Sequence, residues 1–70
     1  DSKAQMTLYK KYAQAMFTVS RNIIKDDMIA EEAMQDAFIN AFEKLNEFSG
    51  EVTFGAWLKK IVINSNYYSA

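Results

Sequence analysis

Apolar and polar positions alternate with a helical period along most of this chain. In its first third, apolar or small residues recur at spacings of three and four, and charged residues fall largely between them. This stripe predicts an amphipathic helix that begins near Ser2, where Ser2 and Gln5 match a capping box. The residues that we expect on its buried side are Tyr9, Tyr12, Ala13, Met16, Ser20 and Ile23, flanked by Leu8, Ala15, Val19 and Ile24.

A second helical stripe follows a pair of aspartates. Asp26 precedes the stripe and suits an N-cap, and Glu31 and Glu32 near the first turn suit the positive end of a helix dipole. We expect this helix over roughly residues 28–47, and its alanines predict that a neighbouring helix approaches closely. The residues that we expect it to bury are Ala30, Ala33, Met34, Ala37, Phe38, Ala41, Phe42 and Leu45.

A loop and a third stripe complete the pattern. Residues 47–53 lack helical periodicity and contain Gly50, and Thr53 is placed to cap the next helix. The expected buried face of that helix is Phe54, Trp57, Leu58, Ile61, Val62, Ser65 and Tyr68, with Lys59, Lys60, Ile63, Asn64 and Tyr67 mainly opposite. With no proline and only two glycines, the chain is predicted to be all-α, a compact bundle of three to four helices.

The composition narrows the class of protein. The chain has 70 residues, 50% of them hydrophobic and 24% charged, which suits one small folded domain. It has no cysteine and no histidine, so disulfides, thiolate nucleophiles, imidazole bases and nearly all zinc chemistry are excluded. No phosphate-binding glycine loop is present either, and we expect neither enzyme activity nor a cofactor. Apolar runs of four residues or fewer predict no membrane span, and we expect a cytoplasmic protein.

The charges are distributed unevenly along the chain. Residues 1–25 carry five basic side chains and one acid, for a net charge of +4. Residues 26–51 carry one basic side chain and eight acids, a net −7, and residues 52–70 carry two lysines and no acid, a net +2. An acidic centre between basic ends suggests two kinds of partner, because the ends attract phosphate and the centre repels it. On charge alone, an ordinary solvated surface stays the alternative.

Five short motifs occur along the chain in a fixed order. They are LYKKY at 8–12, AEEAMQDAF at 30–38, FSGE at 48–51, FGAWL at 54–58 and IVIN at 61–64. These segments resemble the LYxxY, A-E-D-x-x-Q-E-x-F, F-R-G-[DE], F-x-x-W-L and I-A-x-N motifs of region 2 in bacterial sigma factors of the extracytoplasmic-function type. Each motif alone is weak, but five in order at the expected spacing are a strong signal.

The resemblance implies a non-catalytic specificity subunit of bacterial RNA polymerase. Such a subunit joins the core enzyme through the coiled coil of its largest subunit, and it recognises and melts the promoter -10 element through the non-template strand. The resemblance also implies that residues 1–70 are a region 2 domain within a longer chain, whose downstream helix-turn-helix domain is absent here. An anti-sigma factor is a further candidate partner, and a membrane is not.

The outward side of the second helix corresponds to the face that docks on the polymerase in this family. Carboxylates around an amide and one apolar residue suit a basic helical partner, because charges steer the encounter and apolar contact supplies affinity. A dimetal carboxylate site is the rival interpretation, but such bundles use Glu-x-x-His pairs and this chain has no histidine. The expected polymerase-binding residues are Glu31, Glu32, Gln35, Asp36 and Ile39.

The loop 48–53 and the last helix correspond to the DNA-binding elements of the family. A base that leaves the stack needs an aromatic or apolar wall and polar groups for its edge, and lysines bind the phosphates. Asn64 is the strongest single candidate, because an amide both donates and accepts hydrogen bonds. The expected DNA-binding residues are Phe48, Ser49, Gly50, Lys59, Lys60 and Asn64.

Two alternatives stay open at this point. Phe54 and Trp57 either stack on an unpaired base or pack in the core, and their helical spacing favours the core. The family usually has arginine where this chain has Ser49, and its last helix usually carries further basic residues. A helical protein-interaction module without DNA recognition is therefore the second functional hypothesis.

Overall fold

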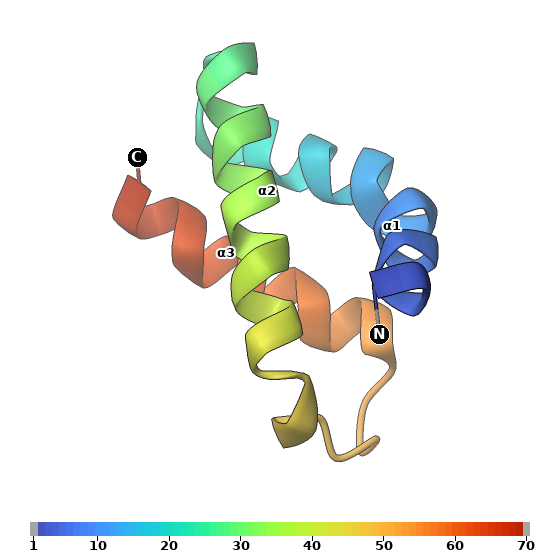
Figure 1. The fold of residues 1–70 in the computed structure, drawn as a ribbon. Helices are drawn as coiled ribbons and strands as arrows, with labels where there is room; N and C mark the ends of the chain where they lie inside the picture. The colour runs from blue at the N-terminus through green and yellow to red at the C-terminus, as the bar shows by residue number, and fades with distance from the viewer. Residues whose placement is uncertain (1, 70) are drawn as a thin grey trace.

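Three α-helices form the described part of the computed structural model, which covers the backbone of residues 2–69 and the side chains of residues 2–66 (Figure 1). They are α1 (Ser2–Ile23), α2 (Asp27–Glu43) and α3 (Phe54–Ser69), with a 3₁₀-helix (Leu45–Glu47) after α2. The expected all-α bundle of three to four helices is confirmed. Over the same residues, no helix has the length and apolar character needed to cross a membrane.

Side-chain caps start the second and third helices where the sequence predicted them. Asp26 has an extended backbone, and its side chain accepts a hydrogen bond from the backbone N–H of Ile29 at 3.0 Å. Thr53 Oγ1 accepts a hydrogen bond from the backbone N–H of Ala56 at 3.2 Å. Each cap satisfies a backbone N–H that has no partner within its own helix.

The end of α2 differs from the prediction. The helix ends at Glu43, and Lys44 leaves α-helical geometry with φ −99° and ψ 10°. The chain then tightens into the 3₁₀-helix, which has fewer residues per turn and so rotates its side chains away from the buried stripe. Leu45, which we expected in the core, is therefore 36% exposed.

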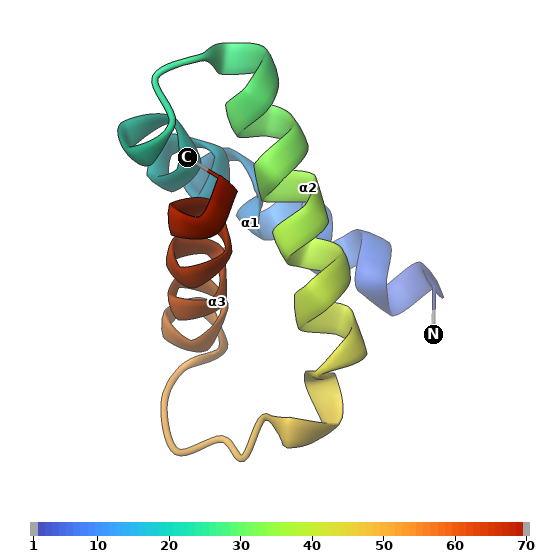
Figure 2. The ribbon, with the colours of Figure 1, turned by 90° about the vertical axis from the view of Figure 1, so that its left-hand side faces the viewer.

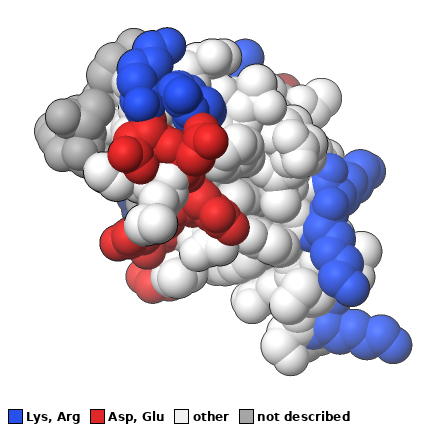
Figure 3. Space-filling view, turned by 90° about the horizontal axis from the view of Figure 1, so that it is seen from above, with Lys and Arg blue, Asp and Glu red and all other residues white. Residues whose placement is uncertain are grey.

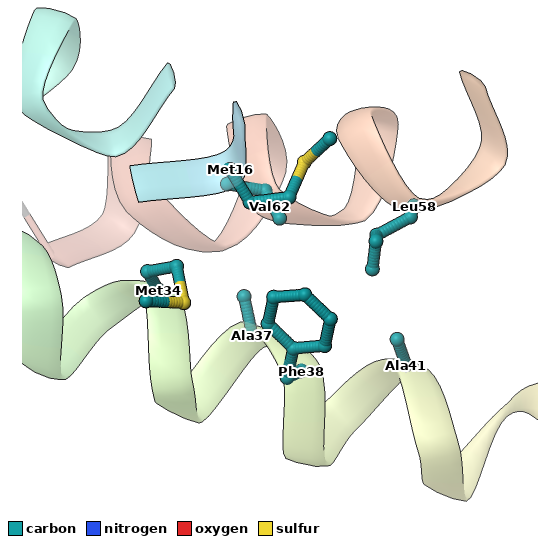
Figure 4. Close-up of a cluster of buried hydrophobic side chains, with 7 residues drawn as sticks. All are labelled: Met16, Met34, Ala37, Phe38, Ala41, Leu58 and Val62. Carbon is teal, nitrogen blue, oxygen red and sulfur yellow. The ribbon is translucent and has the colours of Figure 1, made fainter. Parts of the chain in front are cut away.

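The three helices pack against one another around one core. Each helix contacts the other two: α2 crosses in front of α3 (Figure 1), and α1 passes behind both in the turned view (Figure 2). Ala37 and Ala41 of α2 are fully buried and let α3 approach closely. In Figure 4 the core side chains of the three helices point toward one another; they are Met16, Met34, Ala37, Phe38, Ala41, Leu58 and Val62.

A smaller apolar cluster closes the end of the molecule where α1 meets α2. Ile24, Ala30 and Ala33 are buried there. Arg21 and Asp27 form an ion pair across the same connection, with side chains 39% and 81% exposed. A pair this exposed contributes little to stability, so the apolar cluster is the main attachment at this end.

Most predicted core positions are confirmed, but Ala15, which we expected beside the buried stripe of α1, is exposed. Ring-bearing residues at the edge of the core are half-buried, because their apolar bodies pack on the core while their outer edges reach solvent; these are Tyr9, Tyr12, Phe42, Phe54 and Trp57. Predictions for Tyr67 and Tyr68 lie outside the side chains that the structure describes.

Two polar side chains are fully buried among residues 2–66. Ser20 was expected in the core, but Asn66 was assigned to neither face of its helix. Asn66 Nδ2 donates a hydrogen bond to the Val62 carbonyl at 2.7 Å, and its Oδ1 and the Ser20 Oγ have no partner. Asn66 follows the buried residues Leu58 and Val62 at a spacing of four, so the helical period predicts that it is buried. We did not predict this because asparagine is polar.

Candidate functional site

All five predicted polymerase-binding residues lie on the solvent side of α2. Glu31, Glu32, Gln35, Asp36 and Ile39 are exposed, and Ile39 shows 57% of its surface although it is a large apolar residue. None of them is needed to fill the core. The side chains are therefore available to a partner without any rearrangement of the bundle.

The five residues form a ridge with two flanks rather than one row. Glu31 lines a groove of about 300 Å³ that includes Tyr9 of α1. Glu32 and Asp36 line a separate depression of about 170 Å³ on the opposite side of α2. Since successive residues turn by about 100°, Glu31 and Asp36 lie about 140° apart around the helix. We call the residues between these flanks, Gln35 and Ile39, the α2 ridge.

An apolar groove adjoins the α2 ridge. It has a volume of about 390 Å³ and runs between the first turns of α1 and the outer side of α2. Met6 is 53% exposed at this groove, and sequence reasoning did not select it. The sequence could have identified Met6, because it is an apolar residue on the otherwise polar face of its helix. The residues that line the groove are Ser2, Gln5, Met6, Tyr9, Gln35, Phe38, Ile39 and Phe42.

Charge is segregated on the surface. Figure 3 shows acidic side chains gathered in one group, with basic side chains along a separate edge of the same face and a second basic group beside the acids. Within the part of the chain that the structure describes, no group of three or more Asp or Glu side chains is arranged to hold a metal ion. The gathered acidic side chains are thus a candidate contact surface for a basic partner.

The loop is anchored by aromatic rings. Phe48 is half-buried, with its ring centroid 5.3 Å from that of Trp57 and 5.7 Å from that of Phe54. The Tyr12 ring of α1 lies 5.5 Å from Phe54. Phe48, which we predicted as a wall for a DNA base, is therefore also part of the packing that joins the loop to α1 and α3. Sequence reasoning missed this cluster of four rings.

The tip of the loop is polar and exposed. Gly50 has a φ of 82°, in the left-handed region that residues with a Cβ rarely adopt. Ser49 Oγ accepts a hydrogen bond from the backbone N–H of Glu51 at 3.4 Å, which bends the chain locally. Ser49 and Gly50 thus lie together at the surface, one and two residues beyond the anchored Phe48.

Lys60 and Asn64 lie on one side of α3, and Asn64 is about three turns from the loop. Both are exposed and are four residues apart, so they are neighbours on the helix surface. Trp57 precedes Lys60 by three residues on the same side, and it contacts Phe48. An aromatic surface, an ammonium group and an amide therefore follow one another from the loop along α3. We call Trp57, Lys60 and Asn64 the α3 strip.

Lys59 is not part of the α3 strip. It is exposed but follows Gly55 by four residues, and Gly55 faces α1. A Cβ atom added at Gly55 would lie 3.2 Å from Cε1 of Tyr12, so the two helices approach closely here. Lys59 therefore lies on the side of α3 that borders α1.

Comparisons with known proteins identify the family of this chain. A sequence model of sigma-70 region 2 matches residues 8–69. The RNA polymerase sigma-H factor of Pseudomonas aeruginosa is 32% identical over 65 residues, which are 93% of this chain and 34% of that protein. The chain thus spans about a third of the length of this relative, and no solved structure matches it. Because the family match covers residues 8–69, from the second turn of α1 through α3, the chain belongs to the sigma-70 region 2 family.

Proposed function

We propose that this chain is the promoter-recognition domain of a bacterial sigma factor. It binds core RNA polymerase, and it recognises and melts the promoter -10 element, while the polymerase performs the chemistry. The family match over residues 8–69 carries this proposal. The placement of the α2 ridge and the α3 strip on different helices supports it, because one small domain then presents separate surfaces to a protein and to DNA.

Docking on the polymerase uses the α2 ridge and its acidic flanks. Ile39 and the adjoining apolar groove supply the surface that is removed from water on binding. Glu31 on one flank and Glu32 and Asp36 on the other fit a helical partner whose apolar contact residues are bordered by lysine or arginine on both sides. This charge arrangement steers the encounter and makes it sensitive to salt.

A titration of this chain with the coiled-coil fragment of the polymerase's largest subunit tests the docking surface. We expect saturable binding that the double variant Gln35→Ala/Asp36→Arg abolishes. Glu47→Arg is a matched control, because Glu47 is an exposed acid in the 3₁₀-helix, outside the α2 ridge and its flanks. If the folded chain does not bind the fragment, or if the control loses as much affinity as the double variant, the docking proposal is wrong.

Recognition of the -10 element uses the loop and the α3 strip. Phe48 and Trp57 offer the edge of an aromatic cluster on which an unpaired base can stack, a contact worth about 1–3 kcal/mol. Asn64 is positioned to hydrogen-bond a base edge, and Lys60 to bind an adjacent phosphate. Binding the extruded base stabilises the open form of the promoter over the paired form.

Transcription initiation by the protein assembled with core polymerase tests the DNA surface. We expect Asn64→Ala to reduce open-complex formation by a factor that corresponds to about 1–3 kcal/mol, and Lys60→Ala to reduce it less. Asn46→Ala is the control, because Asn46 is an exposed amide in the 3₁₀-helix. Unchanged initiation by both variants would favour the alternative, a helical interaction module without DNA recognition.

We also propose that the chain belongs to the extracytoplasmic-function type and works in the cytoplasm with the polymerase. The order and spacing of its five motifs support this assignment. An anti-sigma factor that covers the α2 ridge would then compete with the polymerase coiled coil. The competition is measurable, because Gln35→Ala/Asp36→Arg would weaken both partners if they share the surface.

A further inference from the structure

Lys11 is held beside the line where α1 meets the start of α3. Its Nζ lies 5.5 Å from the centroid of the Tyr12 ring, within the range of a cation–π contact. The Cε1 edge of the same ring packs on Gly55, where an added Cβ would be only 3.2 Å away. The Lys11 ammonium group therefore lies beside the ring that joins α1 to the start of α3. We call the line of contact between Tyr12 and Gly55 the α1–α3 seam.

Lys59 borders the same seam from the other helix. It follows Gly55 by one turn of α3, so its side chain leaves the helix on the side that faces α1. Among the residues whose side chains are described, the ion pair is that of Arg21 and Asp27, and no carboxylate neutralises Lys11 or Lys59. The seam thus has an unneutralised ammonium group on each side.

The neighbouring Lys10 lies elsewhere. It precedes Ala13 and Gln14 by three and four residues, and both of these line the groove that contains Glu31 of α2. Lys10 therefore points along the side of α1 that faces α2 and its acids. Two adjacent lysines of one helix are directed to different surfaces of the molecule.

We propose that Lys11 and Lys59 together bind the sugar–phosphate backbone of duplex DNA across the α1–α3 seam. The inference rests on the proposed function, and it extends the DNA surface from the loop and α3 to α1. Two unneutralised ammonium groups on neighbouring helices complement the dense negative charge of a duplex. Such contacts position the duplex, while the loop and Asn64 act on the bases.

A phosphate contact from Lys11 would supplement the small number of basic residues on α3. Lys59 and Lys60 are the two basic side chains of that helix. Each phosphate contact contributes about 0.9 to the slope of log affinity against log salt concentration. A contact from Lys11 adds an increment of this size without any basic residue being added to α3.

Binding of this chain to a labelled DNA duplex, measured by fluorescence anisotropy over a series of salt concentrations, tests the seam. We expect Lys11→Gln and Lys59→Gln each to reduce the magnitude of the salt slope by about 0.9, and the double variant by about twice that. Lys10→Gln is the matched control, because it removes the same charge from the adjacent residue on another side of α1. It should change the slope by less than half as much, and circular dichroism should show equal helix content.

Three outcomes would overturn the inference. They are equal effects of Lys10→Gln and Lys11→Gln, absence of duplex binding at low salt, and binding to single strands alone. Its failure is distinguishable from failure of the proposed function. If Asn64→Ala impairs initiation while Lys11→Gln leaves the salt slope unchanged, the function stands and the seam does not. If Lys11→Gln lowers the slope while Asn64→Ala and Lys60→Ala both leave initiation unchanged, the seam binds phosphate but the promoter-recognition proposal is wrong.

Discussion

The two proposed surfaces of this domain are built in different ways. The α2 ridge and its flanks come from one helix, and their side chains lie outside the core. The DNA side is assembled from the loop, α3 and α1, and rings that also pack the protein hold it together. Substitutions on the first surface should therefore change binding alone, whereas substitutions of the rings on the second should change binding and stability together.

Truncation of a side chain in the core that supports both surfaces should lower the free energy of unfolding most. Phe38 is 2% exposed and contacts the rings of Tyr9 and Phe42, with centroids 4.9 Å and 5.9 Å away. We expect Phe38→Ala to lower the free energy of unfolding by about 3–5 kcal/mol, measured by urea denaturation followed by circular dichroism. A chain this small has little stability to lose, so both surfaces should be lost with the fold.

The adjacent residue provides the control for that experiment. Ile39 is 57% exposed on the α2 ridge, and Ile39→Ala should change the free energy of unfolding by less than about 0.5 kcal/mol. It should nevertheless weaken binding to the polymerase coiled coil. Similar destabilisation by both variants would mean that the ridge is structural, and the contrast between the two surfaces would fail.

Substitution of Phe48, which anchors the loop, should cause the next largest loss of stability. Phe48→Ala removes two ring contacts, with Phe54 and Trp57, and should lower the free energy of unfolding by about 1–3 kcal/mol. The fluorescence of Trp57, the single tryptophan of the chain, should shift to longer wavelength as its ring gains water contact. Affinity for the polymerase coiled coil should stay within twofold of the unmodified chain.

Val52→Ala is the matched control for the loop, because Val52 is an apolar loop residue that is 54% exposed. It should leave stability and Trp57 fluorescence unchanged. An unchanged fluorescence spectrum in Phe48→Ala as well would show that the ring cluster does not anchor the loop in solution.

The N-caps of α2 and α3 allow the docking side and the DNA side to be compared at an equal loss of stability. Thr53→Ala and Asp26→Ala each remove one N-cap hydrogen bond, and each should lower the free energy of unfolding by about 1 kcal/mol. Only Thr53→Ala loosens the first turn of α3, where Gly55 and Trp57 lie, so it alone should also weaken DNA binding. Equal loss of DNA affinity in both variants would mean that the first turn of α3 has no special part in DNA binding.

The helical elements and the α2 ridge follow from the sequence because both depend on local periodicity. The caps at Asp26 and Thr53, and the outward placement of Gln35 and Ile39, were readable from residue type and spacing alone. The exposed position of Leu45 was not, because a single residue at the end of α2 changed the helix geometry.

The DNA side was less predictable because it depends on contacts between segments that are distant along the chain. Tyr12 and Gly55 are far apart in sequence, and only the packed structure shows that the ring beside Lys11 is the one that packs on Gly55 of α3. Phe48 was selected for its aromatic ring, but its contact with Trp57 depends on how the loop returns to the bundle. A helical period predicts which side of a helix is buried and does not predict which helix lies against it.

The docking variant itself should have only a small effect on stability. Gln35→Ala/Asp36→Arg replaces two exposed side chains of α2 with good helix formers, and Asp36→Arg reduces the concentration of acids on that helix. We expect the free energy of unfolding to change by less than about 0.5 kcal/mol, measured by urea denaturation, while binding to the polymerase coiled coil is lost. A loss of more than about 1 kcal/mol would attribute weakened docking to unfolding rather than to the surface. Unchanged stability with unchanged DNA binding would show that the two surfaces are independent, since α2 contributes its outer side to one partner and its inner side to the core that supports the other.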